Sequence, residues 1–402
     1  LVRELHAMLF GDVTQDELIG ATWREIFEVK KDLGESASDR LTPWWEEQRE
    51  ALLELAARED ARGGAYVYST QKLVQAVDSL GELEHVDRVH YAIKANAHPE
   101  IMRLFHDKGV CFECVSPGEV ERALEISGDP SRILFTPNFA PISEYTFGFE
   151  KGVQLTLDNL HPLREHGELF RGQDIFLRLD PGLGRGHHKH VKTAGPQSKF
   201  GLSRDELAEA AELAGKFGFT ITGLHVHVGS GILKSPETWA ENALFLAEQA
   251  DKFFKDVKVL DLGGGLGVVE KPGDRPLSLA LVDEYLGKFK ALHGDRFELW
   301  LEPGRYCVAE AGVLLAEVTQ IKRKGEHAYI GVETGMNSLI RPSLYGAYHH
   351  IVNLSRLHEP SAWTADIVGP ICESGDVLGY SRRLPVTKEG DVLLIATTGA
   401  YG

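Results

Sequence analysis

The 402-residue sequence is poor in cysteine and basic residues, and it contains no long apolar run. Four cysteines in so long a chain do not form the disulfide framework of small secreted domains. No apolar run has the length of a bilayer span, and no charged-then-apolar signal segment opens the chain. Lys and Arg number 43 against 60 Asp and Glu, so the formal net charge is −17, which disfavours a nucleic-acid partner. We therefore expect a cytoplasmic globular protein with no membrane partner.

Cys111 and Cys114 have the CxxC spacing of metal and redox sites. The sequence has no second CxxC and no histidine pair at zinc-finger spacing after it. Both cysteines lie within a strand-like run, where cysteine packs as a small apolar residue. We interpret the pair as structural and predict no metal site, with zinc or redox chemistry as the alternative.

The two ends of the sequence favour a piece of a longer protein. The chain begins at Leu1, and residues 1–11 resemble the end of an amphipathic helix whose beginning is missing. The last residue, Gly402, follows directly after a strand-like run. Helical spacing of apolar residues dominates the early sequence, so we predict a helical N-terminal extension over residues 1–63.

Residues 64–305 are predicted to form an α/β domain, a (β/α)8 barrel. Strand-like runs alternate mostly with helical patterns, and they cover residues 89–93, 111–116, 132–136, 153–158, 175–180, 221–228, 257–263 and 297–304. Eight such units are typical of this barrel. A doubly wound sheet is the alternative, but it usually has fewer strands and a glycine fingerprint after the first one. Here Lys94, Ala95 and Asn96 follow the first strand.

Residues 306–402 are predicted to form a second, β-rich domain of Greek-key or sandwich type. Its strand-like runs cover residues 311–332, 366–374, 375–380 and 391–399 and are joined by turns. Residues 65–69, AYVYS, form a further short strand before the barrel. We expect this strand to pair with the second domain.

The most unusual residues of the sequence follow barrel strands, at the end where barrel enzymes hold their active sites. Lys94 follows the first strand and His227 the sixth. Gly263, Gly264 and Gly265 follow the seventh strand, and Glu302 and Arg305 follow the eighth. Lys94, His227 and the glycines have ordinary alternatives: a surface lysine, a hydrogen-bonded core histidine and a tight turn. Their gathering at one end of the barrel favours a shared site.

Together these groups match the chemistry of pyridoxal phosphate. A lysine amine forms a Schiff base with an aldehyde, and consecutive glycine amides bind a phosphate. Pyridoxal phosphate carries both groups together with a pyridine nitrogen. We predict that Lys94 holds the aldehyde and the glycine turn the phosphate, while Glu302 pairs with the ring nitrogen and His227 stacks on the ring. Arg305 is assigned to the phosphate or to a substrate carboxylate.

Six motifs in order resemble the fold-type III pyridoxal-phosphate decarboxylases: YAIKAN, HVGSG, DLGGGLG, EPGRY, CESGD and GAYG. The resemblance covers residues 64–402, and residues 335–351 and 369–376 look most like the diaminopimelate branch. It implies decarboxylation of meso-2,6-diaminopimelate to L-lysine and carbon dioxide, the last step of lysine biosynthesis. Ornithine, lysine or arginine as the substrate, a racemase, and a non-catalytic homologue are the alternatives.

The resemblance also implies roles for single residues. It makes Lys94 the Schiff-base lysine and His227 the ring-stacking residue, with Glu302 at the pyridine nitrogen. The phosphate would be surrounded by Ser230, Gly265, Arg305 and Tyr401. Arg305, Arg341 and Tyr345 stand at positions associated with substrate carboxylates. Cys372, as a proton donor, and Glu373, as the partner of the distal ammonium, resemble a pair that reaches across a homodimer interface into the partner's site.

Two residues and one segment bear on the details of the site, the substrate and the chain's organisation. Glu113 stands where the family usually has an aspartate near the lysine. Arg341 offers a bidentate partner to the second carboxylate that diaminopimelate has and ornithine or lysine lacks. A surface ion pair is the alternative for Arg341. Residues 2–11, VRELHAMLFG, resemble the last helix of the regulatory region of aspartokinases, which implies the decarboxylase half of a bifunctional aspartokinase–diaminopimelate decarboxylase.

Overall fold

The computed structural model describes residues 43–182 and 198–402. The chain divides into two units, residues 1–48 and residues 49–402. The described part of the first unit holds a short helix, α4 (Trp44–Glu47). Most of the predicted N-terminal extension, including the aspartokinase-like segment 2–11, lies outside the described residues. The predicted domain boundaries at residues 64 and 306 stay predictions.

Eight parallel strands close a barrel within the described part of the second unit. They are β2 (Arg88–Ala92), β3 (Cys111–Cys114), β4 (Ile133–Phe135), β5 (Gln154–Leu157), β6 (Asp174–Arg178), β7 (Thr220–His225), β8 (Val259–Asp261) and β9 (Glu298–Leu301). The barrel closes where β2 pairs with β9, with Arg88 opposite Trp300. The predicted barrel is therefore confirmed.

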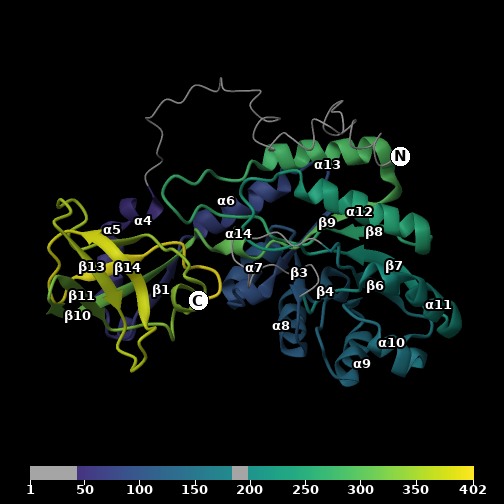
Figure 1. Cartoon of the computed structure of the whole chain (residues 1–402), viewed down its shortest axis with the longest axis horizontal. Coiled ribbons are helices and arrows are strands. Elements are labelled where there is room, and N and C mark those ends of the chain that lie inside the picture. The colour runs from purple at the N-terminus through teal and green to yellow at the C-terminus, as the bar shows by residue number, and fades with distance from the viewer. Residues whose placement is uncertain (1–42, 183–197) are drawn as a thin grey trace. The chain divides into compact units, whose positions relative to one another are not determined.

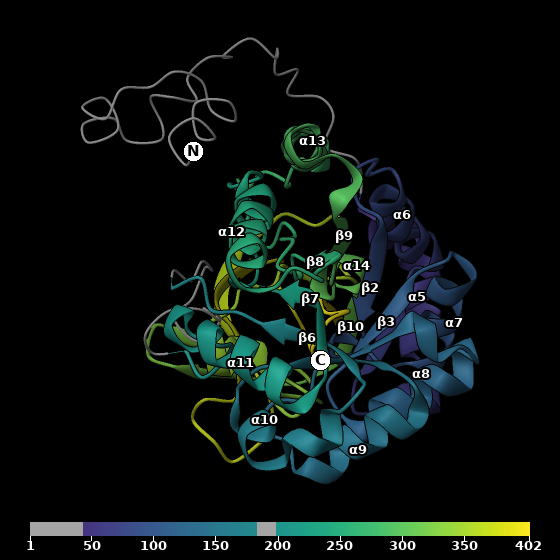
Figure 2. The ribbon, with the colours of Figure 1, turned by 90° about the vertical axis from the view of Figure 1, so that its right-hand side faces the viewer.

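Helices surround the barrel strands, as Figure 2 shows. They are α6 (Thr70–Gly81), α7 (Pro99–Asp107), α8 (Pro117–Ser127), α9 (Ile142–Lys151), α10 (His161–His166), α11 (Leu207–Phe217), α12 (Thr238–Phe253) and α13 (Leu279–His293). Short 3-10 turns are η1 (Glu59–Ala61), η2 (Ile93–Ala95), η3 (Pro130–Arg132), η4 (Gly167–Phe170), η6 (Arg204–Glu206) and η7 (Gly294–Arg296). Local chemistry sets several helix ends: Ser116 caps α8 by accepting the N–H of Glu119, and Gly128 ends it in the left-handed conformation. None of the described helices is long and apolar enough to cross a membrane.

The barrel interior is filled with side chains, so a site can form only at its ends. Leu134, Phe176, Val259 and Trp300 make one buried cluster, contributed by β4, β6, β8 and β9. The ring of His90, on β2, lies 4.7 Å from the ring of Trp300. Such layers of inward-facing side chains are typical of (β/α)8 barrels and leave the loops after the strands to form the site.

The C-terminal part forms a sheet of seven strands among the described residues. They are β1 (Ala65–Tyr68), β10 (Gly312–Lys324), β11 (His327–Val332), β12 (Ile351–Asn353), β13 (Trp363–Val368), β14 (Val377–Leu384) and β15 (Val392–Ile395). The first half of β10 pairs with β1 and β15 and its second half with β11, so β10 belongs to both halves of the sheet. Buried side chains from both halves form one core, as expected for a sandwich-like domain. The pairing of β1 with β10 confirms the predicted pairing of residues 65–69 with this domain, and Figure 1 shows the strands of this sheet at the left of the view.

The structure corrects several details of the predicted second domain. The run 311–332 is two strands, because a turn at Gly325, which has a positive φ of 62°, separates β10 from β11. The predicted strand 366–374 ends at Val368, and residues 369–376 form a turn instead. A short helix, α15 (Arg341–Tyr345), occupies a segment with weak helix signals. The remaining helices are α5 (Arg49–Ala56) and α14 (Arg305–Val308).

Candidate active site

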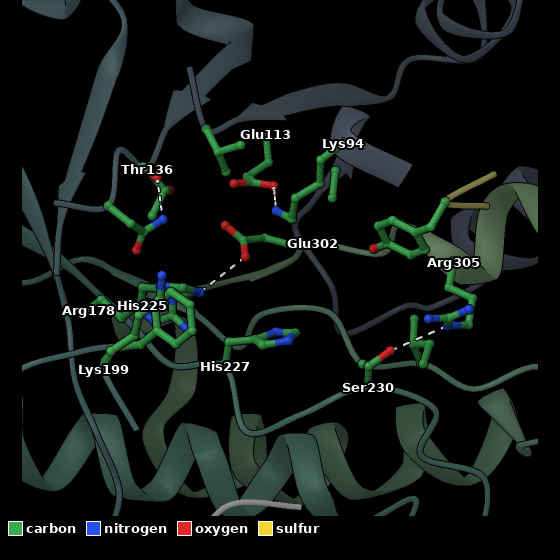
Figure 3. Close-up of a pocket in the computed structure, with 18 residues that line it drawn as sticks. Lys94, Glu113, Thr136, Arg178, Lys199, His225, His227, Ser230, Glu302 and Arg305 are labelled. Carbon is green, nitrogen blue, oxygen red and sulfur yellow. Dashed lines mark hydrogen bonds and ion pairs between the residues drawn. The ribbon is translucent and has the colours of Figure 1, made fainter. Parts of the chain in front are cut away.

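A cavity of about 340 Å³ opens at the C-terminal ends of the barrel strands (Figure 3). Its volume lies in the range of small-molecule sites. The residues predicted from the sequence that line it are Lys94, His227, Ser230, Gly265, Glu302, Arg305 and Tyr401. Strands far apart in the sequence thus bring most of the predicted residues to one place.

Lys94 forms an ion pair with Glu113 at the edge of this cavity. The register of β2 on β3 places Ala92 opposite Glu113, so the turn η2 carries Lys94 over that carboxylate. Burial alone would lower the pKa of Lys94, but the carboxylates of Glu113 and Glu302 outweigh it and raise the pKa above its ordinary value. Burial raises the pKa of Glu113 to about 7, although Lys94 opposes the shift. Glu113 can therefore accept a proton near neutral pH.

Glu302 is a buried carboxylate directed into the cavity. Its Oε2 lies 3.1 Å from Nε2 of His225, and its Oε1 has no hydrogen-bond partner among the described residues. Burial would raise the pKa of Glu302, but His225 and Lys94 outweigh burial and hold the pKa well below its ordinary value. Figure 3 shows the carboxylate between Lys94 and His225. Glu302 can thus hold a negative charge against a cationic N–H group of a ligand.

The ring of His227 is neutral and fixed in place. Its Nδ1 accepts a hydrogen bond from the amide of Gly264 at 3.2 Å, so the other ring nitrogen carries the proton. Burial and the nearby Arg178 lower the pKa of His227 to about 3. A neutral, buried ring lining the cavity suits contact with a flat aromatic ligand better than ion pairing.

The three consecutive glycines serve different purposes. The amide of Gly263 donates to Oδ1 of Asp261 at 2.9 Å, and that of Gly264 donates to His227, so neither amide is directed at a ligand. A Cβ on Gly263 would lie 2.4 Å from the carbonyl oxygen of Val226, and one on Gly264 would lie 2.3 Å from that of Glu302. Only the third, Gly265, lines the cavity. Close packing of backbone requires the first two glycines, so within the predicted phosphate-binding turn only Gly265 faces the cavity, and its assignment to the phosphate stays a prediction.

Ser230, Gly265, Arg305 and Tyr401 form an end of the cavity suited to an anion. Nε of Arg305 lies 3.4 Å from Oγ of Ser230, and its guanidinium lies 5.0 Å from the centre of the Tyr401 ring. Nη1 of Arg305 is buried without a hydrogen bond among the described residues. The amide of Tyr401 donates to the carbonyl of Ala95, which ties the C-terminal segment to the turn that carries Lys94. A phosphate fits this set of donors.

Comparison with known proteins shows which protein family has this fold and site. Residues 70–309 match the family described as "Pyridoxal-dependent decarboxylase, pyridoxal binding domain". A diaminopimelate decarboxylase of Methanothermobacter thermautotrophicus is 38% identical over 328 residues, which are 78% of this chain and 75% of that protein. The chain belongs to the diaminopimelate decarboxylase family. The cofactor predicted from the sequence, pyridoxal phosphate, is confirmed at the level of the family.

Two further relatives of this decarboxylase family cover most of the chain. The diaminopimelate decarboxylase of Escherichia coli K12 is 32% identical over 360 residues and is matched over 84% of each chain. The crystal structure of diaminopimelate decarboxylase from Helicobacter pylori complexed with L-lysine has a TM-score of 0.78 and 29% identity. It covers 88% of this chain, and 89% of that chain is matched. Barrel and sheet domain together are therefore the family fold.

Arg341 and Tyr345 do not line the cavity. Arg341 is 2% exposed, its Nη2 donates to Oε1 of Glu270 at 2.6 Å, and its Nη1 lies 3.0 Å from Nε2 of His349. Nη1 of Arg305 lies 3.6 Å from the same oxygen of Glu270. Arg341 is thus neither a surface ion pair nor open to a substrate in this structure, and Glu270 joins it to Arg305.

We expect Arg341→Met to lower the free energy of unfolding by about 3 kcal/mol, because Glu270 is left buried with one partner fewer. Chemical denaturation measures the change. The double variant Arg341→Met/Glu270→Gln should recover part of the loss, because it removes the unpaired charge as well. A loss in the double variant equal to the sum of the two single losses would contradict this account of the ion pair.

Cys372 and Glu373 are exposed and lie away from the residues that line the cavity. They belong to the turn 369–376, which Asp376 holds from inside: its carboxylate accepts the amides of Met336 at 2.6 Å and Ile371 at 2.8 Å. Large apolar side chains are exposed at the start of α15 and within it, on this turn and on β14: Ile340, Leu344, Ile371 and Tyr380. The turn and α15 are joined by a hydrogen bond from Ser343 to Gly375.

Several polar residues of the site were missed by sequence reasoning. Arg178 and His225 line the cavity, while Asp261 lies by His225 and Glu302, and Glu270 by Arg305, all of which line it. A signal was present for Arg178 and Asp261, because each interrupts an apolar strand with a charged residue, in IFLRLD and VLDL. A buried charge in a strand requires a partner, and in a barrel that partner lies on a neighbouring strand. Glu270 follows no such pattern.

Proposed function

We propose that this protein decarboxylates meso-2,6-diaminopimelate to L-lysine and carbon dioxide with pyridoxal phosphate as its cofactor. The carrying observation is Lys94, paired with Glu113 and beside Glu302, in a cavity whose other end is suited to an anion. The proposal is also supported by curated relatives that are named diaminopimelate decarboxylase.

The residues around the cavity fit this cofactor. Lys94 would hold its aldehyde carbon, and Ser230, Gly265, Arg305 and Tyr401 would surround its phosphate. Oε1 of Glu302, buried without a partner among the described residues, would accept the N–H of the pyridine ring. When bound, the cofactor supplies an electron sink for the electron pair of the breaking carbon–carboxylate bond.

The chain's own part in the reaction is to place charges and move protons. Glu302 remains anionic because His225 and Lys94 stabilise its charge, so it keeps the ring nitrogen protonated. Glu113 accepts the proton that Lys94 must lose before its amine can react with a carbonyl. The neutral ring of His227 packs against the ligand without competing for its charge.

The raised pKa of Glu113 predicts a pH dependence of stability. Its pKa rises from 4.5 to about 7 on folding, so its contribution to stability is present below pH 4.5 and is lost as the pH rises through 7. Relative to Glu113→Gln, the unfolding free energy of the unmodified protein should fall by about 3 kcal/mol between pH 4.5 and 8. Denaturant titrations at several pH values test this, with Glu121→Gln on α8 as the control. Parallel curves for Glu113→Gln and the unmodified protein would contradict the assignment.

Substrate choice depends on the distal end of the amino acid. Diaminopimelate carries a second carboxylate, and Arg305, which lines the cavity and lies 3.6 Å from Glu270, the partner of Arg341, would pair with it. A charge-assisted pair of this kind contributes enough for a preference on the order of tenfold to a hundredfold. Values of kcat/KM for meso-diaminopimelate, L-lysine, L-ornithine and L-arginine test the proposal. A higher value for any of the last three would favour the alternative substrate.

Cys372 and Glu373 would act in a homodimer, each reaching the cavity of the partner subunit. The support is their exposure on a well-held turn beside the exposed apolar residues Ile340, Leu344 and Tyr380, since exposed apolar patches mark interfaces. Mixing Lys94→Ala and Cys372→Ala chains after mild dissociation tests this. If the mixture regains activity, the site is shared between subunits. If mixed dimers form but no activity returns, the proposal is contradicted.

The aspartokinase fusion and the cytoplasmic location remain predictions. The fusion rests on residues 2–11, which lie outside the described residues, and the location rests on composition. A phosphoryl-transfer assay with aspartate, on a chain extended toward its N-terminus, would test the fusion.

A further inference from the structure

Three acid–base groups meet beneath the cavity: His225 at the end of β7, Asp261 at the end of β8, and Glu302 just after β9. Their polar atoms lie within 4.8 Å of one another. The side chains are 2%, 0% and 7% exposed, respectively. The proposed reaction uses only Glu302, so the presence of a second buried carboxyl group beside it requires an explanation.

Asp261 has one carboxyl oxygen in a hydrogen bond and one buried without a partner in the described part of the chain. Its Oδ1 accepts the amide N–H of Gly263 at 2.9 Å. Its Oδ2 is buried and has no hydrogen-bond partner among the described residues, and the same holds for Oε1 of Glu302. If both carboxyl groups were ionised, two buried like charges would lie side by side with unsatisfied oxygens, which is strongly unfavourable.

Cations in the neighbourhood do not remove this conflict. Lys94 is paired with Glu113, a further carboxylate that acts on the same cluster. His225 offers one ring nitrogen, which lies against Glu302. The other charged or titratable groups that face the cluster from neighbouring strands are His90, Arg178 and His227. Nε2 of His225 lies 3.1 Å from Glu302, whereas Oδ2 of Asp261 has no hydrogen-bond partner among the described residues, so the proton belongs on Asp261.

We propose that Asp261 is a neutral carboxylic acid whose Oδ2 donates a hydrogen bond to Glu302, and that it is a positioning residue for the Glu302 anion. Burial and the charge of Glu302 raise the pKa of Asp261 well above its ordinary value, which agrees with this assignment. The hydrogen bond from Gly263 fixes Oδ1, so Oδ2 is the oxygen left for Glu302. The importance of Asp261 for catalysis rests on the proposed function, but the protonation state of Asp261 does not.

Asparagine is the matched replacement for a neutral aspartic acid. In Asp261→Asn, the side-chain oxygen accepts the Gly263 amide and the NH2 group donates to Glu302, so both hydrogen bonds remain. In Asp261→Ala, neither remains, and Glu302 loses a donor. We expect the dissociation constant for pyridoxal phosphate to change little in Asp261→Asn and to rise about tenfold in Asp261→Ala.

Infrared spectroscopy of the cofactor-free protein tests the protonation state directly. The measurement is made on the Glu113→Gln background, because Glu113, with a pKa of about 7, would add an acid band of its own near neutral pH. At neutral pH this protein should show the C=O stretch of a buried, protonated carboxylic acid that does not exchange quickly with solvent. Asp261→Asn should remove this band, while Asp261→Glu should shift it and Glu302→Gln should leave an acid band in place. No protonated-acid band, or a band removed by Glu302→Gln and kept in Asp261→Asn, overturns the proposal.

Two further results separate a structural role from the proposed one. Cofactor titration followed by absorbance should give tight binding for Asp261→Asn and weak binding for Asp261→Ala. Both titrations are made well below the unfolding midpoint of Asp261→Ala, which leaves the buried amide of Gly263 without its acceptor. Equal loss of binding in both variants would overturn the proposal, as would a stoichiometric metal ion in the purified protein. Because the infrared readout needs neither cofactor nor substrate, it stands even if the decarboxylase assignment fails.

Discussion

The Lys94→Ala variant is expected to lose the visible absorbance of a bound cofactor and at least about 10³-fold in decarboxylation rate. Lys94 is the lysine that lies beside two carboxylates in the cavity, where its amine is held toward the ligand. Alanine removes the amine, so the cofactor can bind only through its phosphate and ring. Absorbance spectra during cofactor titration and initial rates under saturating substrate measure the two effects.

Lys108→Ala is the matched control, because Lys108 is exposed and paired with Asp78 on the outside of the barrel. This variant should retain both absorbance and activity. If Lys94→Ala kept the absorbance and the rate of the unmodified protein, the assignment of the cavity as the cofactor site would be wrong. Unfolding of the two variants should be compared as well, since Lys94→Ala leaves Glu113 buried without its partner.

The Glu302→Gln variant is expected to lower kcat by about 10²- to 10³-fold with a smaller effect on KM. Glutamine keeps the shape of the side chain but holds no charge, so the ring nitrogen loses the anion that keeps it protonated. Steady-state kinetics on meso-diaminopimelate separates kcat from KM. Glu298→Gln, an exposed residue at the start of β9, the strand that Glu302 follows, is the control. A pure rise in KM would instead assign Glu302 to substrate binding.

The same substitution has a predicted effect on acid stability. The pKa of Glu302 is lowered on folding, so its contribution to stability is present above its ordinary pKa of 4.5 and is lost as the pH falls below that value. The unmodified protein should therefore lose more stability than Glu302→Gln on acidification below pH 4.5. The pH range in which Glu302 loses its contribution lies below the range in which Glu113 loses its own. The two contributions to stability can therefore be distinguished in one pH series.

Sequence patterns predicted the barrel and the gathering of reactive residues at one end of it. Alternating strand and helix signals are local, and the carboxyl ends of parallel strands must lie at one end of a closed barrel. That rule alone brings Lys94, His227 and Glu302 together. The presence of a separate β-rich region was also predicted, because its strand-like runs are joined by turns and contain little helix, but several of its strand boundaries were not.

Register and side-chain pairing could not be predicted in the same way. The N–H groups of Gly263 and Gly264 donate hydrogen bonds to Asp261 and His227. Whether these hydrogen bonds form depends on the distance between neighbouring strands. Arg341 is buried against Glu270, a residue 71 positions away in a loop with no distinctive pattern. The position of Cys372 on an exposed turn follows from Asp376, whose two hydrogen bonds end the strand early. Such contacts arise only when the chain has folded.

Release of carbon dioxide from meso-diaminopimelate by the purified protein is the most direct test of the central claim. With pyridoxal phosphate present, we expect carbon dioxide and L-lysine to appear in equal amounts, and we expect neither when the cofactor is removed or Lys94 is replaced by alanine. A protein that binds the cofactor but releases no carbon dioxide, or one whose Lys94→Ala variant releases it undiminished, would contradict the account.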